Sequence, residues 1–443
     1  MTQKDIHVIG GGLAGCEAAL RLAAHGLKAT IWEMKPNKFS PAHRLNTLAE
    51  LVCSNSLRSD NPEKAVGLLK EELTKLGSVV ARAALESRVP AGQCLAVDRN
   101  VFSQKVTDFV ANHPLITLKR EEFTGGPLPS SPLIIAGGPL ASEPLVAFLK
   151  ELNPEKNLFF YDALAPIVAY ESLDLSKTYR ADRYGEGEGD YINCPLTQEE
   201  YATFYAALIE ADRVEPRSFE ENRCFEGCLP IEVMAQRGPK TLTFGPMKPV
   251  GLNDPKTGQR PAAVVQLRRE NLAGTLWNLV GFQTRLTRPA QDKVFRLIPG
   301  LAKAEFSRYG AIHRNTYLEA PKVLDPYGRL KAHPEIFVAG QLSGVEGYVE
   351  SAAQGLWAGE NAARQTLGLP LVRPPRETAL GSLLSHLEDF GGRREFAPSN
   401  VNFGLFPAPP PNEARQNLSL GRLKRARSAF DPFLEAINYV YWS

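Results

Sequence analysis

The sequence predicts an α/β fold in which a parallel-sheet domain is split by an inserted α+β domain and followed by a short helical C-terminal tail. Two glycine-bearing turns, each between a strand pattern and a helix pattern, lie far apart in the chain. The chain has 443 residues, too many for one ordinary hydrophobic core, so two or three domains are expected. The hydrophobic fraction of 43% and the charged fraction of 23% are typical of a globular protein.

The first strand–turn–helix unit begins at Ile6, and Ile6–Ile9 has the pattern of a buried strand. The turn has the spacing G-x-G-x-x-G and consists of Gly10, Gly11, Gly12, Leu13, Ala14 and Gly15. The three glycines of the motif allow a tight turn, a close approach to a pyrophosphate and close packing of helix on strand. A second strand ends at Glu33, whose carboxylate suits the ribose hydroxyls of FAD or NAD and would repel the 2′-phosphate of NADP. A Rossmann-type dinucleotide-binding domain is therefore predicted.

The second unit favours FAD over NAD. A strand pattern at Ile336–Ala339 is followed by Gly340 and Gln341, a turn containing Gly347, and a helix rich in small residues. This order resembles the C-terminal flavin motif of two-part FAD enzymes, with Gln341 in place of the usual acid. The segment 132–142, with its Ala-Gly-Gly turn, is a looser match to a third piece of the same domain. We therefore expect an FAD-binding domain that is split in the sequence.

Four segments follow from this division. We expect the first part of the FAD-binding domain at 1–150, an inserted substrate domain at 151–300, the second part at 301–370, and a helical tail with a proline-rich linker at 371–443. Within the insert, Thr197 and Glu200 have the spacing of a capping box at the start of a helix. The basic, proline-containing run 237–271 is expected to form strands and turns.

Composition excludes several classes of protein. The net charge of +2 gives no general field for polyanions, although a local basic face remains compatible with it. The six cysteines are spread without a CxxC pair, and the seven histidines show no ligand spacing, so no metal site is expected. The N-terminus has no signal-peptide pattern, and no apolar run is long enough to span a membrane. We expect a cytoplasmic protein without membrane association.

The cysteines divide into two groups by their neighbours. Cys16, Cys94 and Cys194 fit the usual role of a small buried apolar side chain. Cys53 and Cys228 stand among polar and turn-forming residues, where nearby donors or an arginine favour a reactive thiolate. From these features alone, a structural and a chemical role for the second group are about equally probable.

Several long motifs together resemble the folate- and FAD-dependent tRNA uracil-5-methyltransferases, the TrmFO family. The resemblance covers nearly the whole chain. It is carried by HVIGGGLAGCEAA, ELVCSNSLRSD, AVDR, FEGCLPIEVMAQRGPKTLTFGPMKPVGL, GFQTRL, RYGAIHRNTY and GYVESAAQGLWAG. A related flavoenzyme family that modifies the wobble uridine shares the nucleotide-binding frame but typically has a larger helical C-terminal domain.

The resemblance implies that methylenetetrahydrofolate donates one carbon to carbon 5 of a T-loop uridine in tRNA, while NAD(P)H reduces the FAD. By motif match, Cys228 is the nucleophile and Cys53 its acid/base partner, with Cys224 as the competitor for the first role. A thiolate adding to carbon 6 would make carbon 5 nucleophilic. Tyr348 falls where the family places an aromatic ring near the flavin and the thiol.

The remaining expectations concern partners. Candidate RNA contacts in the insert are Arg237, Lys240, Lys248, Lys256, Arg260, Arg268, Arg269, Arg285 and Arg288, extended in the tail by Arg422, Lys424, Arg425 and Arg427. Arg308, His313 and Arg314 face either the folate or the RNA, or lie on a solvated strand pair. We expect a monomer or weak oligomer. The alternatives are an FAD-dependent oxidoreductase acting on a small molecule, a wobble-uridine-modifying flavoprotein, and a non-catalytic tRNA-binding flavoprotein.

Overall fold

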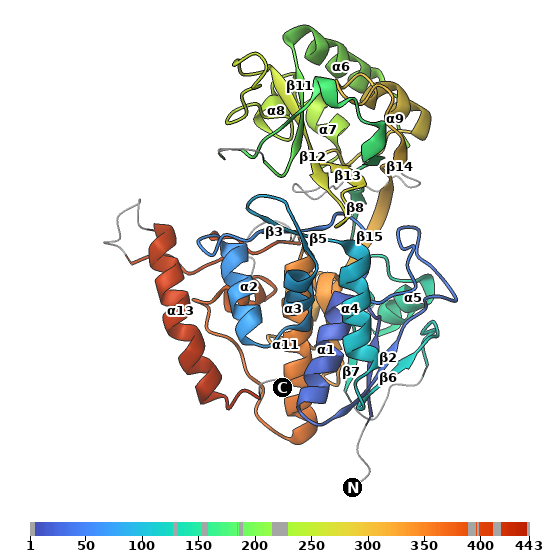
Figure 1. Cartoon of the computed structure of the whole chain (residues 1–443). Coiled ribbons are helices and arrows are strands. Elements are labelled where there is room, and N and C mark those ends of the chain that lie inside the picture. The colour runs from blue at the N-terminus through green and yellow to red at the C-terminus, as the bar shows by residue number, and fades with distance from the viewer. Residues whose placement is uncertain are drawn as a thin grey trace.

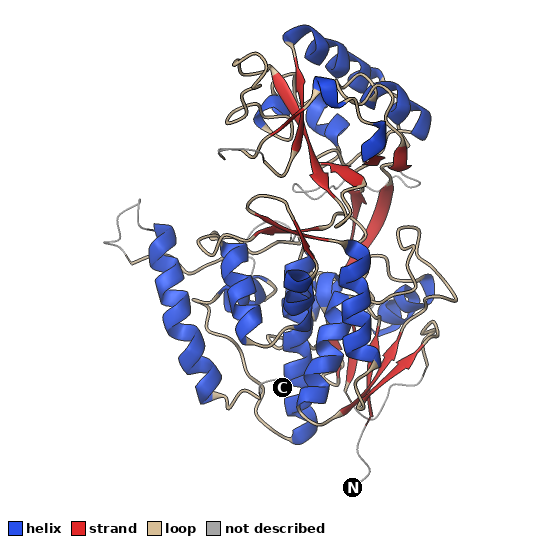
Figure 2. Ribbon diagram, in the orientation of Figure 1, coloured by secondary structure: helices blue, strands red, loops and turns tan. Residues whose placement is uncertain are grey.

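The chain forms two lobes joined by a two-stranded ribbon (Figure 1). The computed structural model describes residues 5–126, 132–152, 158–183, 185, 189–214, 229–388, 396, 398–410 and 418–440. The lower lobe has a parallel sheet with helices around it, and the upper lobe has an antiparallel sheet with helices on its outer side (Figure 2). Among the described residues, no helix combines the length and apolar character needed to cross a membrane.

The lower lobe is built on a five-stranded parallel sheet in the order β16-β7-β1-β2-β6. Its strands are β1 (Asp5–Ile9), β2 (Lys28–Trp32), β6 (Ile116–Lys119), β7 (Leu133–Ile135) and β16 (Ile336–Val338). β7 is a fully buried apolar run, and β1 buries Ile6, Val8 and Ile9, as expected for central strands of a covered parallel sheet. β16 returns from far along the chain to pair with β7, in the register Val338↔Ile135. The predicted α/β class and the split parallel-sheet domain are confirmed.

Two helices start at the carboxyl edge of this sheet and pack closely together. α1 (Leu13–Ala24) and α11 (Tyr348–Leu367) make contact through small residues, because a Cβ at Gly355 or Gly359 would clash with the α1 backbone at Ala14 or Ala18. The lobe also contains α2 (Ala65–Lys75), α3 (Val79–Glu86), α4 (Arg99–Ala111), α5 (Glu143–Leu152), α10 (Ala320–Val323) and the 3-10 turn η4 (Gly340–Ser343).

A small antiparallel sheet lies on the side of the lower lobe that faces the upper lobe (Figure 1). Its order is β3-β5-β4, formed by β3 (Ser56–Ser59), β4 (Arg88–Val89) and β5 (Cys94–Val97). β3 directly follows the segment that contains Cys53, so this sheet fixes one end of that segment.

The upper lobe is the inserted domain. Its sheet has the order β10-β11-β12-β13-β9-β14, formed by β9 (Ile167–Ala169), β10 (Tyr179–Arg180), β11 (Ile192–Leu196), β12 (Ala263–Arg269), β13 (Leu276–Leu279) and β14 (Phe306–Arg308). Its helices are α6 (Gln198–Glu210), α7 (Ile231–Gln236), α8 (Thr241–Phe244) and α9 (Arg288–Phe295), and its two 3-10 turns are η1 (Tyr170–Ser172) and η2 (Leu175–Lys177). Fully buried aromatic side chains, among them Trp277, Phe204 and Phe295, form its core. The capping box of Thr197 and Glu200 at the start of α6 is confirmed.

The run 237–271 differs from the sequence-based expectation. Only β12 is a strand, beginning at Ala263, while the preceding residues form turns and the short helix α8. Prolines recur through these preceding residues, and proline cannot donate a hydrogen bond to a sheet.

The ribbon that joins the lobes pairs β8 (Leu158–Ala163) with β15 (Ile312–Tyr317) in antiparallel fashion. The chain thus enters and leaves the inserted domain side by side. The limits at 150 and 300 remain sequence-based predictions, and strand pairing places β14 in the sheet of the inserted domain.

The tail packs back on the lower lobe with α12 (Ala379–His386) and α13 (Leu418–Ala436). Tyr439 Oη donates to Leu76 O at 2.8 Å, and the Arg21 guanidinium donates to Val440 O. Arg21 also donates to the buried Glu360 carboxylate at 2.7 Å, so the C-terminal tail is held to α1, and α1 to α11.

Candidate active site

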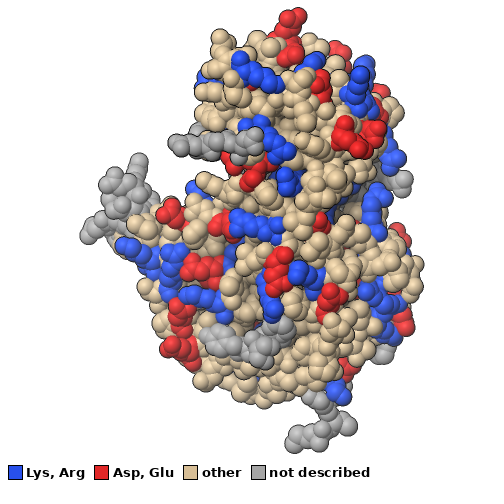
Figure 3. Space-filling model, in the orientation of Figure 1, with Lys and Arg blue, Asp and Glu red and all other residues tan. Residues whose placement is uncertain are grey.

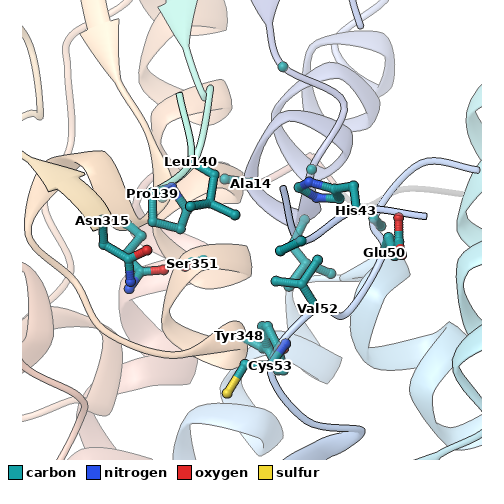
Figure 4. A pocket seen from close by; sticks show the side chains of 18 of the residues that line it. Ala14, His43, Glu50, Val52, Cys53, Pro139, Leu140, Asn315, Tyr348 and Ser351 are labelled. Atoms are coloured by element: carbon teal, nitrogen blue, oxygen red, sulfur yellow. The ribbon is translucent and has the colours of Figure 1, made fainter. Parts of the chain in front are cut away.

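A cavity of about 410 Å³ lies at the carboxyl ends of the parallel strands, the usual place for a ligand in such a sheet. The turns after β1, β7 and β16 form one wall. Residues of the inserted domain form the opposite wall and comprise Arg268, Asn278, Val280, Gly281 and Gln283. Figure 4 shows lining side chains around this space, with Pro139 and Leu140 on one side, His43 and Glu50 on another, and Cys53 beside Tyr348.

The glycine motif forms the floor of the cavity. Gly10 has φ +106°, and a Cβ there would clash with the carbonyl oxygen of Ala136. A Cβ at Gly15 would clash with Gly10 O, which accounts for a glycine where helix meets strand. In front of Gly12 there is open space within 4 Å, and no side chain caps the start of α1 there. The helix start thus presents backbone amides to the cavity, as a pyrophosphate requires.

Glu33 follows β2 and is buried beside the motif. Its Oε2 accepts from Gly11 N at 3.0 Å and its Oε1 accepts from Lys35 N at 3.0 Å. These bonds orient the carboxylate at the cavity wall, which Glu33 itself lines. A carboxylate in this place suits ribose hydroxyls.

The second flavin motif lies beside the first, on the same wall of the cavity. Gly340 has φ +69°, its N–H donates to Gln354 Oε1 at 2.6 Å, and a Cβ there would press on Ala14. Gln341 lines the cavity and donates to the Glu346 carboxylate. Gly347, with φ +106°, is the N-cap of α11. The cavity, the open space at Gly12 and the two helix starts fit a dinucleotide such as FAD.

Tyr348 and Cys53 are brought together at one end of this cavity (Figure 4). Tyr348 Oη accepts from Cys53 N at 2.7 Å and from Ser54 N at 3.2 Å. Burial raises the pKa of the Tyr348 phenol, with a further contribution from the neighbouring Cys53 thiol. The phenol therefore stays neutral at physiological pH, and its oxygen anchors the Cys53 backbone.

Two arginines hold the other side of the same segment. Arg99 Nη1, on α4, donates to Leu51 O at 2.7 Å and to Val52 O at 3.3 Å. Arg308, on β14, donates from Nη1 to Val52 O at 3.2 Å and from Nη2 to Cys53 O at 3.3 Å. Burial and the charge of Arg99 lower the pKa of Arg308 to about 10.

The expectation for Arg308 needs a correction. Its guanidinium binds the backbone of the Cys53 segment and does not line the cavity, whereas we expected it to face folate, RNA or solvent. The sequence shows which residues are basic but not which carbonyl groups they reach. The side chains of His313 and Arg314 lie outside the described part of the structure.

Cys228 and its competitor Cys224 lie outside the described residues. The described chain resumes at Leu229, and Ile231 N donates to Gln283 O at 2.8 Å. Since Gln283 lines the cavity, the segment that starts at Leu229 runs beside the cavity wall.

The remaining cysteines differ among themselves. Cys16 and Cys194 are fully buried; burial raises the thiol pKa of Cys16 far above its usual range and that of Cys194 to about 12. Both therefore match the structural role expected for them. Cys94 is only partly buried, and its Sγ lies 2.8 Å from Ser56 Oγ, so its surroundings are more polar than expected.

The candidate RNA contacts separate into buried and exposed groups. Arg268 is 7% exposed and donates to Asn55 Oδ1, and Arg285 lies 3.7 Å from the buried Glu232 carboxylate. The exposed members are Arg237, Lys240, Lys256, Arg260 and Arg288 in the insert and Lys424 and Arg427 in the tail. Figure 3 shows Lys and Arg side chains in the notch where the two lobes meet.

Sequence reasoning missed several residues of the site. Arg99 belongs to the AVDR motif, which gave no hint that its side chain reaches Leu51 O. Ala49 and Arg58 line the cavity with φ of +50° and +62°, conformations that side chains other than glycine rarely adopt. Non-glycine residues in this region have no signature in a single sequence.

Comparisons with known proteins agree on one family. The family model described as "Glucose inhibited division protein A" matches residues 5–370. The chain is 54% identical over 434 residues to "Methylenetetrahydrofolate--tRNA-(uracil-5-)-methyltransferase TrmFO" of Geobacter sulfurreducens, covering 98% of this chain and 99% of the relative. It is 53% identical over 428 residues to the protein of the same name in Moorella thermoacetica, covering 97% of each.

Among solved structures, the chain is similar to Aquifex aeolicus GidA in its form II crystal. The TM-score is 0.69 at 17% identity, and the match covers 98% of this chain and 75% of that one. At this identity the likeness supports the fold alone. About a quarter of that chain has no counterpart in the match.

Proposed function

Because the chain belongs to the TrmFO family of methylenetetrahydrofolate--tRNA-(uracil-5-)-methyltransferases, within the wider glucose-inhibited division protein A family, we propose that it methylates carbon 5 of a T-loop uridine in tRNA. Methylenetetrahydrofolate is the one-carbon donor and NAD(P)H the reductant of bound FAD. The observation that carries this proposal is the dinucleotide-type cavity that ends at Cys53 and Tyr348.

The residues of the two glycine motifs hold the cofactor in this proposal. Backbone amides at the start of α1 bind the pyrophosphate beside Gly12, Glu33 accepts from the ribose, and Gln341 with the start of α11 contacts the flavin end. When bound, FAD supplies the electrons that convert the transferred methylene to a methyl group.

The thiols carry out the steps on the uridine. Cys228 adds to carbon 6, which makes carbon 5 nucleophilic toward the methylene, and Cys53 takes part in the transfer of the carbon 5 proton. Cys53 is supported in this role by its place at the cavity, next to a phenol that stays neutral. The target base must leave its stack to reach the thiols.

The inserted domain contributes the RNA contacts. In addition to its exposed basic residues, this domain presents Phe244 on α8, whose side chain is 79% exposed. Phe244 lies two residues from Pro246, which contacts Gly281 at the cavity wall. Basic residues bind phosphates and an exposed aromatic ring stacks on an unpaired base. We also propose a cytoplasmic location and a monomer or weak oligomer.

The alternatives make different predictions. A small-molecule oxidoreductase with a dedicated NAD(P)H site would show a second clear G-x-G-x-x-G motif, which the sequence lacks, and a wobble-uridine enzyme would act on the anticodon. Sequence identity above 50% over nearly the whole length supports the T-loop activity over both. A non-catalytic tRNA-binding protein would tolerate loss of either cysteine.

One assay tests the proposal. The protein is incubated with tRNA that lacks the T-loop methyl group, methylenetetrahydrofolate labelled in its methylene, and NADPH. We expect label at carbon 5 of the T-loop uridine, and label in another base or in none would refute the proposal. Cys53→Ala and Cys228→Ala should abolish labelling while FAD stays bound. Cys94→Ala, the matched control, should keep labelling within about twofold of the unaltered protein, as for a residue outside the reacting groups.

A further inference from the structure

The Cys53 segment has no regular secondary structure, yet side chains from three places hold its backbone. The carbonyl oxygens of Leu51, Val52 and Cys53 accept from two guanidinium groups, and the N–H groups of Cys53 and Ser54 donate to one phenol. Buried backbone groups need such partners. Here every partner is a side chain from elsewhere in the fold, so each of these side chains takes part in setting where the Cys53 backbone lies.

The three holding residues come from different parts of the molecule. Arg99 lies on α4 and Tyr348 on α11, both in the lower lobe. Arg308 lies on β14, whose strand partner is β9 of the inserted domain. Arg308 is therefore the member of this set that ties the Cys53 backbone to the inserted domain.

The surroundings of Arg308 indicate that this contact is costly to form. Two like-charged guanidiniums, those of Arg99 and Arg308, both donate to Val52 O, and the buried Glu270 carboxylate pairs with Arg99. Arg308 Nε is buried without a hydrogen-bond partner among the described residues. Burial opposes the charge of the guanidinium, so the contact is formed at a cost in free energy.

A second contact between the lobes lies immediately beyond the segment. The buried Asn55 accepts from Arg268 Nε at 3.1 Å and donates to Arg269 O at 3.0 Å, both on β12 of the inserted domain. It also donates to Val97 O at 3.0 Å within the lower lobe. The inserted domain therefore makes hydrogen bonds to the chain on both sides of Ser54, at Val52 and Cys53 before it and at Asn55 after it.

We propose that Arg308 is a positioning residue through which the inserted domain sets the place of Cys53 in the active site. The planar guanidinium fork reaches two successive carbonyl groups, Val52 O and Cys53 O, at once. A lysine at position 308 can donate to only one of these carbonyl groups at a time, and a methionine can donate to neither. The kinetic part of this inference rests on the proposed methylation, and the structural part does not.

The kinetic test uses the full chain with FAD bound and compares Arg308→Lys and Arg308→Met. Arg308→Met should lower kcat about 100-fold with the KM for tRNA and folate unchanged within about twofold, because misplacing a reacting group affects the chemical step. Arg308→Lys should recover part of the loss. Arg296→Met is the matched control, since Arg296 pairs with Asp292 on the surface of α9, and it should keep kcat within about twofold.

Hydrogen exchange gives a readout that does not depend on activity. In Arg308→Met the amides of Cys53 and Ser54 should exchange at least about tenfold faster, while those of β1 and α1 keep their protection. Unchanged exchange at these two amides, or a kcat within about threefold of the unaltered protein, would overturn the proposal. If the unaltered protein shows no methylation, the proposed function fails, and the exchange comparison still decides the role of Arg308.

Discussion

Tyr348 acts on the Cys53 segment through its oxygen as well as its ring. Sequence comparison draws attention to the aromatic ring, but Tyr348 Oη accepts from two successive backbone N–H groups. Because burial raises the phenol pKa, the hydroxyl also keeps its proton as a donor. One side chain at the start of α11 therefore both lines the cavity and holds the backbone of the Cys53 segment.

Removing that oxygen tests this dual role. In Tyr348→Phe the ring remains while the amides of Cys53 and Ser54 lose their acceptor. The free energy of unfolding should fall by about 1–3 kcal/mol, the usual cost of unpaired buried polar groups. Methylation should fall at least about tenfold with FAD still bound. Urea unfolding and the labelling assay measure the two effects.

The control for this variant is Tyr309→Phe, which removes a hydroxyl bonded to Asp292 in the inserted domain. It should change the free energy of unfolding by less than about 1 kcal/mol, as for a more exposed hydrogen bond. Equal losses in the two variants would contradict a special role for the Tyr348 oxygen.

Among the elements, α12 depends on a carboxyl group from another helix. Glu72 of α2 accepts from Ala379 N at 2.7 Å and from Leu380 N at 2.8 Å. Burial nevertheless raises the pKa of Glu72 from its ordinary 4.5 to about 8. The folded state therefore binds a proton that the unfolded state has released between these two values. On account of this group, the free energy of unfolding falls as pH rises from about 5 to about 8.

Glu72→Gln should flatten this dependence, because glutamine keeps an acceptor oxygen and does not titrate. Urea unfolding at pH 5, 6, 7 and 8 measures the slope. A weaker slope of the same sign should remain in this variant, because burial also raises the pKa of Glu17, to about 7. The control is Glu63→Gln at an exposed carboxyl, and its free energy of unfolding should show the same slope with pH as that of the unaltered protein. An unchanged slope in Glu72→Gln would show that Glu72 does not titrate in this range.

The short helix α8 should influence RNA binding without affecting the chemical step. If Phe244 stacks on a base, Phe244→Ala should raise the KM for tRNA about tenfold, in line with about 1–3 kcal/mol per stacked base, and leave kcat unchanged. Leu175→Ala removes another exposed apolar side chain of the inserted domain, 45% exposed, and should leave KM unchanged. Steady-state kinetics over a range of tRNA concentrations distinguish the two variants.

At the scale of the whole molecule, the features that the sequence predicted best are those encoded in short local patterns, such as glycine turns and the strands and helices beside them. The glycine motifs at Gly10 and Gly340 indicated the split sheet, since turn geometry and helix packing restrict these positions to glycine. The contact of Arg308 was out of reach because it depends on how the inserted domain sits on the lower lobe. That of Arg99 was out of reach because it joins two segments of the lower lobe that are 48 residues apart in the sequence. No periodicity or spacing records the orientation of one domain on another. The role of Cys228 remains a prediction from the motif.

The C-terminal tail is joined to α1 and α11 by a buried charge network. Glu360 on α11 accepts from Arg21 and lies 2.9 Å from His25 Nε2, and Arg21 also donates to Val440 O. Although burial raises the pKa of Glu360, hydrogen bonds and charges from His25 and Arg21 lower it to about 2 overall. Its stabilising contribution is present above pH 4.5 and is lost as the pH falls toward 2.

Glu360→Gln should therefore destabilise the protein by about 3–5 kcal/mol at pH 7, because it leaves Arg21 buried without its counter-charge. The difference from the unaltered protein should shrink as the pH falls from 4.5 toward 2, because the carboxyl of the unfolded chain then takes up a proton while that of the folded chain is still ionised. Urea unfolding at pH 7 and at pH 3 tests both statements. Glu335→Gln, at a more exposed carboxyl beside His333, is the control and should change stability by less than about 1 kcal/mol.

The ribbon of β8 and β15 has a consequence for how such a protein could arise. Leu158 and Tyr317 are register partners, so the two places where the insert departs from the lower lobe are neighbours in space. A short turn could join them directly, since adjacent strands lie about 5 Å apart. An ancestral gene could thus have gained the upper lobe as one cassette, and other cassettes could be exchanged at the same point without interrupting the parallel sheet.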